Sequence, residues 1–265
     1  METHAHFCGE RESMPFTEQQ SFFDRHGYVL LPGVVPARQV AQLSAELMAE
    51  FSRAKSAGEL FAGGGMISGH LNCFPGEQTR FVYQALEAAG VIDLVQKLSA
   101  AAVRLPNVGC NFNLPASGFQ NHHVDGYAAE PFMICNVGMV KTSVRNGAMQ
   151  ISPGSHKRAY KYWEFVCARH PATQIEMNPG DVLLRPSTLW HRGMPNRSEQ
   201  PRPMLGFTWE DGGSRADDPF GLHAGKIKFL PNRYTQNLAG RARERAFAKL
   251  PRLGGGYLFL RSLLR

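Results

Sequence analysis

Residues 120–126, Gln-Asn-His-His-Val-Asp-Gly, contain two side chains, those of His123 and Asp125, that are common ligands of a divalent metal ion. Alternate residues of a β-strand point to the same face, so this spacing predicts that His123 and Asp125 lie side by side while His122 points to the opposite face. A His-x-Asp triplet is weak evidence by itself, because a chain with ten histidines produces such triplets by chance. A third ligand is needed to make the pattern specific.

His191 supplies that third ligand, 68 residues after His123 in the sequence. A strand predicted at 181–185 leads towards it and would bring its imidazole to the mouth of a barrel. Two histidines and one carboxylate form the facial triad of non-heme Fe(II) oxygenases, which leaves positions on the metal open for a cosubstrate and O₂. Arg202 opens a further predicted strand, and its guanidinium suits the distal carboxylate of a dicarboxylate cosubstrate that chelates the metal.

The elements that must position these residues are short strands separated by turn signals such as Asn146-Gly147, Pro153-Gly154 and Pro179-Gly180. Seven strands are predicted, at residues 108–114, 120–126, 133–142, 148–151, 173–177, 181–185 and 203–209. Many short strands of this kind predict a mainly β barrel or sandwich. Asn111 and Asn113, two apart on the first of these strands, are candidates to face the substrate and the cosubstrate respectively.

The N-terminal part of the chain is predicted to be helical around one short strand. Helices are expected at 17–26, 36–55 and 79–100, and residues 27–33 read as a buried strand. The glycine-rich segment 57–78 is expected to be a loop, either an ordinary surface loop or a lid over a site. Trp163 could line a substrate pocket or simply pack in the core.

Charge divides the chain unevenly. The total is +7, from 29 Lys and Arg against 22 Asp and Glu, but residues 221–265 alone hold ten basic residues and one acid. We therefore expect a flexible lead at 1–15, a catalytic domain at 16–220 and a basic C-terminal extension at 221–265. That extension either packs on the core or makes peripheral contact with an anionic membrane. Nucleic-acid binding is not expected, since no nucleic-acid motif accompanies the basic residues.

The compartment is indicated by the cysteines. The five cysteines are scattered and form no metal-binding or disulfide spacing, which favours a reducing, cytoplasmic location. The N-terminus lacks the features of a signal peptide, and no apolar run is long enough to span a bilayer.

Taken in order, the motifs closely resemble those of the phytanoyl-CoA dioxygenase family of Fe(II)/2-oxoglutarate oxygenases. The resemblance covers residues 16–210 and rests on Gly27-Tyr28-Val29-Leu30-Leu31-Pro32-Gly33, Gln120-x-x-His123-x-Asp125, Asn146-Gly147-Ala148-Met149, Pro153-Gly154-Ser155-His156, Gly180-Asp181-Val182, Trp190-His191-Arg192-Gly193 and Arg202. It implies a double-stranded β-helix (jelly-roll, cupin-like) core with flanking helices. It also implies iron on His123, Asp125 and His191, the C5 carboxylate of 2-oxoglutarate on Arg202, and a cosubstrate contact at Gln120.

The implied activity is that of a dioxygenase. Decarboxylation of 2-oxoglutarate with O₂, giving succinate and CO₂, would be coupled to oxidation of an unactivated C–H bond, most simply hydroxylation, in a small-molecule, acyl or lipid-linked metabolite. Halogenating relatives carry Ala or Gly at the position of Asp125, so its presence favours oxygenation. The family has an aromatic residue immediately before the first iron ligand, and this chain has His122 there, which is expected to be structural or to face the substrate.

Two other functions fit part of the same pattern. A zinc hydrolase could use the same three ligands to activate water, although a hydrolase needs no dicarboxylate clamp such as Arg202. A catalytically silent binding module on the same scaffold is the third possibility. Metal analysis with measurement of O₂ and 2-oxoglutarate consumption would separate the three.

Overall fold

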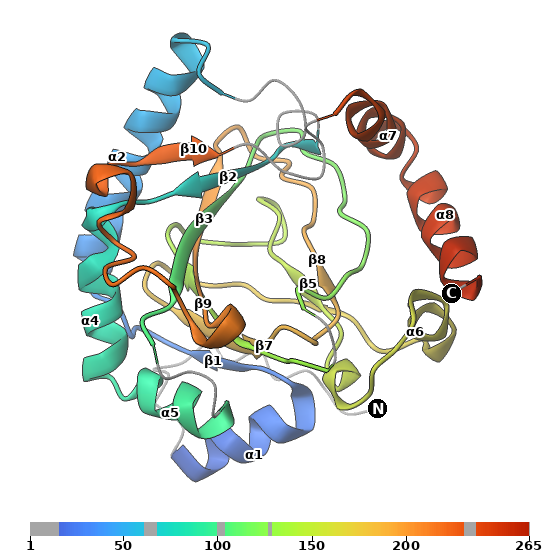
Figure 1. Cartoon of the computed structure of the whole chain (residues 1–265), viewed down its shortest axis with the longest axis horizontal. Helices are drawn as coiled ribbons and strands as arrows, with labels where there is room; N and C mark the ends of the chain where they lie inside the picture. The colour runs from blue at the N-terminus through green and yellow to red at the C-terminus, as the bar shows by residue number, and fades with distance from the viewer. Residues whose placement is uncertain (1–15, 61–67, 100–103, 127–128, 231–236, 265) are drawn as a thin grey trace.

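Two antiparallel β-sheets face each other in this chain, and helices lie on both sides of them (Figure 1). The computed structural model describes residues 16–60, 68–99, 104–126, 129–230 and 237–264. The predicted lead at 1–15 and the glycine-rich stretch 61–67 lie outside the described residues. The arrangement of strands and helices confirms the prediction of a mainly β fold with flanking helices.

The larger sheet has seven strands and the smaller sheet has three. The order in the larger sheet is β1 (Val29–Leu31), β7 (Val182–Pro186), β4 (Met133–Gly138), β9 (Arg202–Thr208), β3 (Asn107–Asn113), β2 (His70–Phe74) and β10 (Lys228–Leu230). The order in the smaller sheet is β6 (Thr173–Gln174), β5 (Gln150–Ile151) and β8 (His191–Arg192). The described strands pair in antiparallel fashion throughout both sheets.

Helices surround this core. The α-helices are α1 (Phe16–His26), α2 (Ala37–Ser56), α4 (Arg80–Ala88), α5 (Val91–Leu98), α6 (Tyr162–Ala168), α7 (Leu238–Lys249) and α8 (Pro251–Leu263), and the 3₁₀ turns are η1 (Glu77–Thr79), η2 (Ser155–Lys157), η3 (Glu210–Gly212) and η4 (Leu222–Gly225). Among the described residues, no helix combines the length and apolar character that crossing a bilayer requires.

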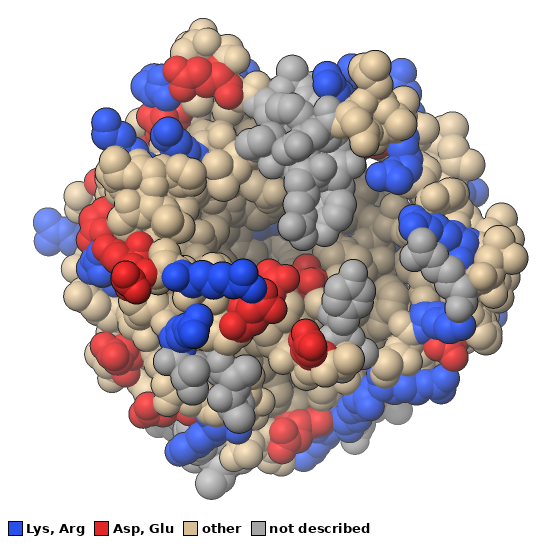
Figure 2. All heavy atoms as spheres, viewed as in Figure 1, with Lys and Arg blue, Asp and Glu red and all other residues tan. Residues whose placement is uncertain are grey.

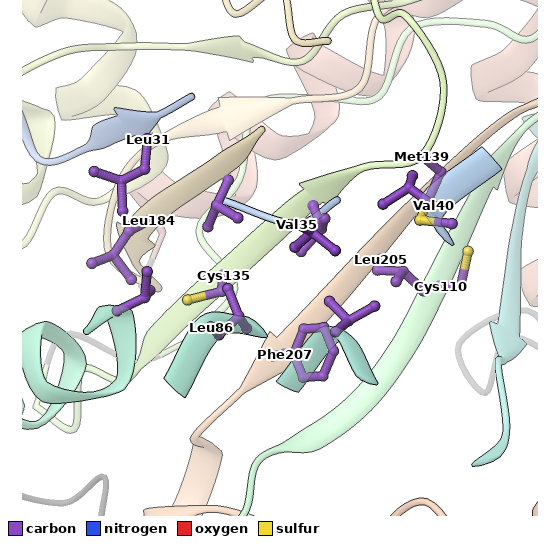
Figure 3. Packing of buried hydrophobic residues seen from close by; sticks show 14 of the residues in the cluster. Leu31, Val35, Val40, Leu86, Cys110, Cys135, Met139, Leu184, Leu205 and Phe207 are labelled. Atoms are coloured by element: carbon purple, nitrogen blue, oxygen red, sulfur yellow. The ribbon is translucent and has the colours of Figure 1, made fainter. Parts of the chain in front are cut away.

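The two faces of the larger sheet differ in chemistry. Cys135, Leu205 and Phe207, on the face towards α2, α4 and α5, are fully buried in one apolar cluster with residues of those helices (Figure 3). Full burial of one such large side chain stabilises the fold by about 1.5–3 kcal/mol. The opposite, concave face looks towards the smaller sheet, where Leu183 and Met204 join a second, smaller apolar cluster. The helix-covered face therefore provides most of the core, and the concave face is available for a site.

Three predicted elements differ from the structure. The helix expected at 79–100 is two helices, because Gly90 adopts a left-handed conformation with φ +72 between α4 and α5. The segment 120–126 is not a regular strand and forms an isolated bridge at His123. The Asn146-Gly147 turn forms but connects β4 and β5, which belong to different sheets, so it does not close a hairpin.

The glycine-rich segment 57–78 and the predicted C-terminal extension both contribute strands to the larger sheet. The end of the glycine-rich segment forms β2, which pairs with β3. Lys228–Leu230 forms β10, which pairs with β2 at the edge of the sheet. Both strands are short, and neither has the alternating apolar pattern that identified the other strands.

Candidate active site

Three side chains with metal-binding atoms converge between the sheets: those of His123, Asp125 and His191. Backbone hydrogen bonds bring the two segments together, since His123 N–H donates to the His191 carbonyl at 2.9 Å and His191 N–H to the His123 carbonyl at 3.0 Å. Asp125 N–H donates to the Ser187 carbonyl at 2.8 Å, which is a second contact between the two segments outside the register of the first pair. The structure thus brings together the two motifs that the sequence separates by 68 residues.

Both histidine rings are held in the same way. His123 Nδ1 lies 2.9 Å from the Asn121 carbonyl, and His191 Nδ1 lies 2.9 Å from the Leu189 carbonyl. A carbonyl oxygen only accepts, so each Nδ1 carries the hydrogen and each Nε2 presents its lone pair. Fixing the tautomer in this way prepares both rings for a metal ion at Nε2.

The free atoms face one another. His123 Nε2 lies 3.6 Å from Asp125 Oδ1, and His191 Nε2 lies 3.4 Å from Asp125 Oδ2. One ligand atom from each of the three residues can be chosen so that all lie within 4.8 Å of one another. With both Nε2 atoms unprotonated, the two imidazole nitrogens and the Asp125 carboxylate are all hydrogen-bond acceptors, and none of them can donate a hydrogen to another. A cation satisfies all three, so the residues fit a metal ion with two imidazole ligands and one carboxylate.

The charge states agree with this geometry. Burial lowers the pKa of His191 to about 3, which keeps its imidazole neutral near pH 7. Burial alone would raise the pKa of Asp125, but His191 and Arg185 outweigh it and hold that pKa below its ordinary value. The ligand set therefore combines a neutral imidazole at His191 with an ionised carboxylate.

Arg185 is a part of the site to which sequence analysis gave no role. Its Nη2 donates to Asp125 Oδ2 at 2.7 Å and its Nε donates to Asn136 Oδ1 at 3.1 Å. The Arg185 side chain is only 5% exposed, so this is a buried ion pair with a metal-binding carboxylate. Arg185 is two residues after Leu183 on β7, so strand alternation puts both side chains on the concave face. This spacing is the signal by which the sequence could have identified Arg185.

Arg202 is a second buried cation. It lies on β9 opposite Asn113 of β3, and its Nη2 donates to the Gly147 carbonyl at 3.1 Å. Burial lowers the pKa of Arg202 to about 10, so it remains charged near pH 7. Its Nε is buried without a hydrogen-bond partner, and no acid among the described residues lies within ion-pair distance. An unpaired buried charge is costly, and a bound carboxylate would satisfy it.

The predicted cosubstrate residues Asn113 and Gln120 both hold the site together. Asn113 is fully buried, donates to the Met194 carbonyl at 2.9 Å and accepts from Ser117. Gln120 Oε1 accepts from Gly193 N–H at 2.8 Å, two residues after His191. These contacts fix the segments around the ligands.

His70, on β2, was missed by sequence analysis. It is the register partner of Asn113, and burial lowers its pKa to about 4, with further lowering by Arg202 and His123. It therefore lies close to both the metal-binding residues and Arg202. Its position inside the glycine-rich segment gave no pattern from which to identify it.

The three predicted substrate-pocket residues lie in different places. Asn111 is half-buried on the concave face of β3. His122 points away from His123 and packs on Phe165 of α6, with ring centroids 5.2 Å apart. Trp163, also on α6, donates its backbone N–H to Ser262 of α8 at 3.0 Å. The structure thus places Asn111 on the concave face and the other two at α6.

The C-terminal helix reaches the metal-binding segment. A Cβ atom at Gly254 of α8 would lie 2.8 Å from Asn121 Nδ2, so a larger residue there would require the Asn121 side chain to move. Asn121 is the residue whose carbonyl accepts from the His123 ring. Helix α8 therefore packs against the side chain of the residue whose carbonyl orients the His123 ring.

Comparison with known proteins gives both a family and a fold. Residues 23–204 match the family model described as "Phytanoyl-CoA dioxygenase (PhyH)". Among solved structures, the chain is similar to the non-heme alpha-ketoglutarate-dependent carbocyclase SnoK from nogalamycin biosynthesis, with TM-score 0.59 and 17% identity over 76% of this chain and 86% of that one.

Two further structures show the same likeness. AviO1 from Streptomyces viridochromogenes Tue57 matches with TM-score 0.57 and 18% identity over 75% of this chain and 96% of that one. EctD from S. alaskensis, a structure with bound Fe, matches with TM-score 0.57 and 17% identity over 75% and 79%. At these identities the likeness concerns the fold, and it confirms the predicted double-stranded β-helix core.

Proposed function

Because this chain belongs to the phytanoyl-CoA dioxygenase family, we propose that it is an Fe(II)- and 2-oxoglutarate-dependent dioxygenase that hydroxylates an unactivated C–H bond of a small metabolite. Iron(II), 2-oxoglutarate and O₂ are the cofactor and cosubstrates of this family. The observation that carries the proposal is the convergence of His123 Nε2, Asp125 and His191 Nε2, three acceptors within 4.8 Å, together with the buried, unpaired cation of Arg202.

The proposal gives each residue of the chain a role. His123, Asp125 and His191 hold the metal, and Arg185 keeps the Asp125 carboxylate ionised and oriented. Arg202 binds the distal carboxylate of 2-oxoglutarate, with Asn113 and Gln120 beside it. When the cofactor is bound, the chemistry it supplies is activation of O₂, coupled to decarboxylation of 2-oxoglutarate. Residues 16–220 carry the catalytic site in this proposal, and 221–265 form the extension.

Binding of 2-oxoglutarate is the direct test. We expect calorimetry to detect 2-oxoglutarate binding when Mn(II) is present and none in the metal-free protein, because the metal supplies part of the binding site. With Fe(II) and O₂, the same protein should release succinate. Zinc-dependent ester hydrolysis without 2-oxoglutarate binding would instead support the hydrolase. If the protein neither binds 2-oxoglutarate nor turns over either type of substrate, the catalytically silent binding module is the remaining interpretation.

We also propose that α7 and α8 contact an anionic membrane surface. Leu253 and Leu260 lie along one exposed face of α8 and Leu264, 89% exposed, follows at its C-terminal cap, and Arg252 and Arg261 border that face on either side. Lys and Arg gather over α7 and α8 at the right of the molecule (Figure 2). Leucines flanked by arginines suit the boundary between acyl chains and anionic headgroups. A second copy of the same basic face would be repelled.

Vesicle cosedimentation of the full chain tests this contact. Vesicles of phosphatidylcholine containing phosphatidylglycerol should bind the protein, and pure phosphatidylcholine vesicles and high salt should weaken binding. The L253Q/L260Q variant should bind at least about tenfold more weakly, because two leucines no longer enter the bilayer. Leu222→Gln, at an exposed leucine elsewhere, is the matched control. Failure of the unaltered chain to bind, or capture by an acidic protein alone, would refute membrane contact.

A reducing compartment such as the cytoplasm also belongs to this proposal. Cys73, Cys110, Cys135 and Cys167 are free thiols in the structure. Cys73 and Cys110 are direct register partners on β2 and β3, yet they form no disulfide. Free thiols at facing positions are consistent with a compartment that keeps cysteine reduced.

A further inference from the structure

On the concave face of the larger sheet, several residues of the central strands are partly exposed to solvent, although central strands are usually covered on both faces. Strands β3, β9 and β4 are central, and on their helix-covered side Phe112, Leu205 and Cys135 are fully buried. On the concave side, several residues of the same strands remain partly exposed: Gly109, Asn111, Asn136, Gly206 and Thr208. Figure 2 shows a recess at the centre of the face seen here, which in Figure 1 is the space between the sheets.

The floor of this opening is made of glycine. Gly109 and Gly206 are direct partners on β3 and β9, and Gly206 is also the partner of Asn136 on β4. A Cβ atom at Gly109 would meet nothing within 4 Å, and one at Gly206 would meet only Asn136 Nδ2, at 3.7 Å. Neither glycine has a positive φ, so the backbone does not require glycine there. Both glycines leave free space above the sheet.

Among the described residues, the partly exposed side chains around the glycines on the concave face are polar and uncharged. Asn136 Nδ2 can donate a hydrogen bond and Asn111 Oδ1 can accept one, because Asn111 Nδ2 already donates to the Leu71 carbonyl at 3.4 Å, and Thr208 adds a hydroxyl. The apolar residues of the concave face, Ile134, Leu183 and Met204, are buried and offer no surface to a ligand. An acyl chain would contact little apolar surface on the described part of this face, because the side chains of the second apolar cluster are buried.

The opening adjoins the metal-binding residues through two hydrogen bonds. Asn136 Oδ1 accepts from Arg185 Nε, and Arg185 Nη2 donates to Asp125. Arg185 Nη1 is buried and has no hydrogen-bond partner among the described residues. A molecule lying on the glycine floor beside Asn136 is therefore placed next to the carboxylate that would hold the metal.

We propose that this surface binds the substrate, and that the substrate is an uncharged, hydroxyl-rich ring such as a sugar ring, in place of a fatty acyl chain. The inference rests on the proposed function, since it concerns the same site. The paired glycines leave room for a pyranose ring, and its hydroxyl groups can donate to Asn111 Oδ1 and accept from Asn136 Nδ2. Asn136, held through its Oδ1 by Arg185, retains its Nδ2 as a donor to such a hydroxyl.

Stimulation of succinate formation tests the substrate class. The Fe(II) protein with 2-oxoglutarate and O₂ is supplied with methyl pyranosides of different stereochemistry, or with decanoyl-CoA. We expect at least one pyranoside to raise the initial rate of succinate release several-fold over the substrate-free rate, and decanoyl-CoA to leave it unchanged. Stimulation by decanoyl-CoA, or by none of the pyranosides, would overturn the inference.

A glycine variant locates the effect. Gly109→Val fills the opening with a side chain that meets no neighbour, and valine favours a strand, so the melting temperature should not fall. Its ratio of pyranoside-stimulated to substrate-free succinate release should fall to one. Gly256→Val, on α8 where a Cβ also meets nothing, is the matched control and should keep the full ratio.

The two proposals fail separately in this assay. Substrate-free succinate release that depends on Fe(II) and 2-oxoglutarate reports the proposed function alone. Its absence would refute that function, whereas its presence without pyranoside stimulation would refute the substrate class only. Unchanged stimulation of Gly109→Val would show that the ring binds elsewhere.

Discussion

The Asp125→Ala variant is expected to release no succinate above the metal-free background and to be markedly less stable than the unaltered protein. Activity is lost because one of the three converging acceptors disappears. Stability is lost because Arg185, 5% exposed, keeps its charge without the carboxylate that pairs with it. Breaking a buried ion pair from one side costs about 3–5 kcal/mol. Succinate release and thermal unfolding measure the two effects.

A double variant separates the two causes. Replacing Arg185 as well, in Asp125→Ala/Arg185→Met, removes the unpaired charge, so much of the lost stability should return because an apolar pair can replace a buried ion pair. Succinate release should stay at background. Full turnover by Asp125→Ala would contradict the assignment of the metal site, and an unchanged melting temperature would contradict the importance of the ion pair.

The Arg202→Met variant is expected to bind 2-oxoglutarate about 10- to 100-fold more weakly, because hydrogen bonds to a charged group contribute about 1.5–3 kcal/mol. The same change should not lower the melting temperature, since it removes a buried cation that has no acidic partner among the described residues. Calorimetry with Mn(II) and 2-oxoglutarate, together with thermal unfolding, measures both.

Two further arginine variants sharpen the interpretation. Arg202→Lys should be intermediate, because an ammonium group keeps the charge and loses the bidentate geometry. Arg192→Met, at a half-buried arginine of β8 that donates to Gln150, is the matched control and should bind 2-oxoglutarate normally. Normal binding by Arg202→Met, or equal losses in both methionine variants, would contradict the role given to Arg202.

The sequence predicted those features of the site that depend on local order. Strand parity placed His123 and Asp125 on one face and His122 on the other, and the structure agrees even though 120–126 is not a regular strand. The hydrogen bonds that His123 exchanges with His191 give this position the local geometry of an antiparallel pair. The order of motifs also indicated the correct fold.

Features that depend on long-range pairing could not be predicted. Arg185 has a role only because β7 brings it against Asp125, 60 residues away. His70 and β2 lie in a glycine-rich segment whose pairing with β3 is decided by the sheet and not by local pattern. The open concave face likewise depends on register, since Gly109 faces Gly206 only in the folded sheet.

The close packing of α8 on Asn121 has a consequence for the order in which the site is completed. Asn121 and Gly254 are 133 residues apart in the sequence, and Gly254 follows His191 by 63 residues. A chain emerging from the ribosome can pair His123 with His191 long before residue 254 has been synthesised. The packing of α8 on Asn121 therefore becomes possible only after the pairing of His123 with His191, so the segment that carries His123 gains this contact after its pairing with the His191 segment.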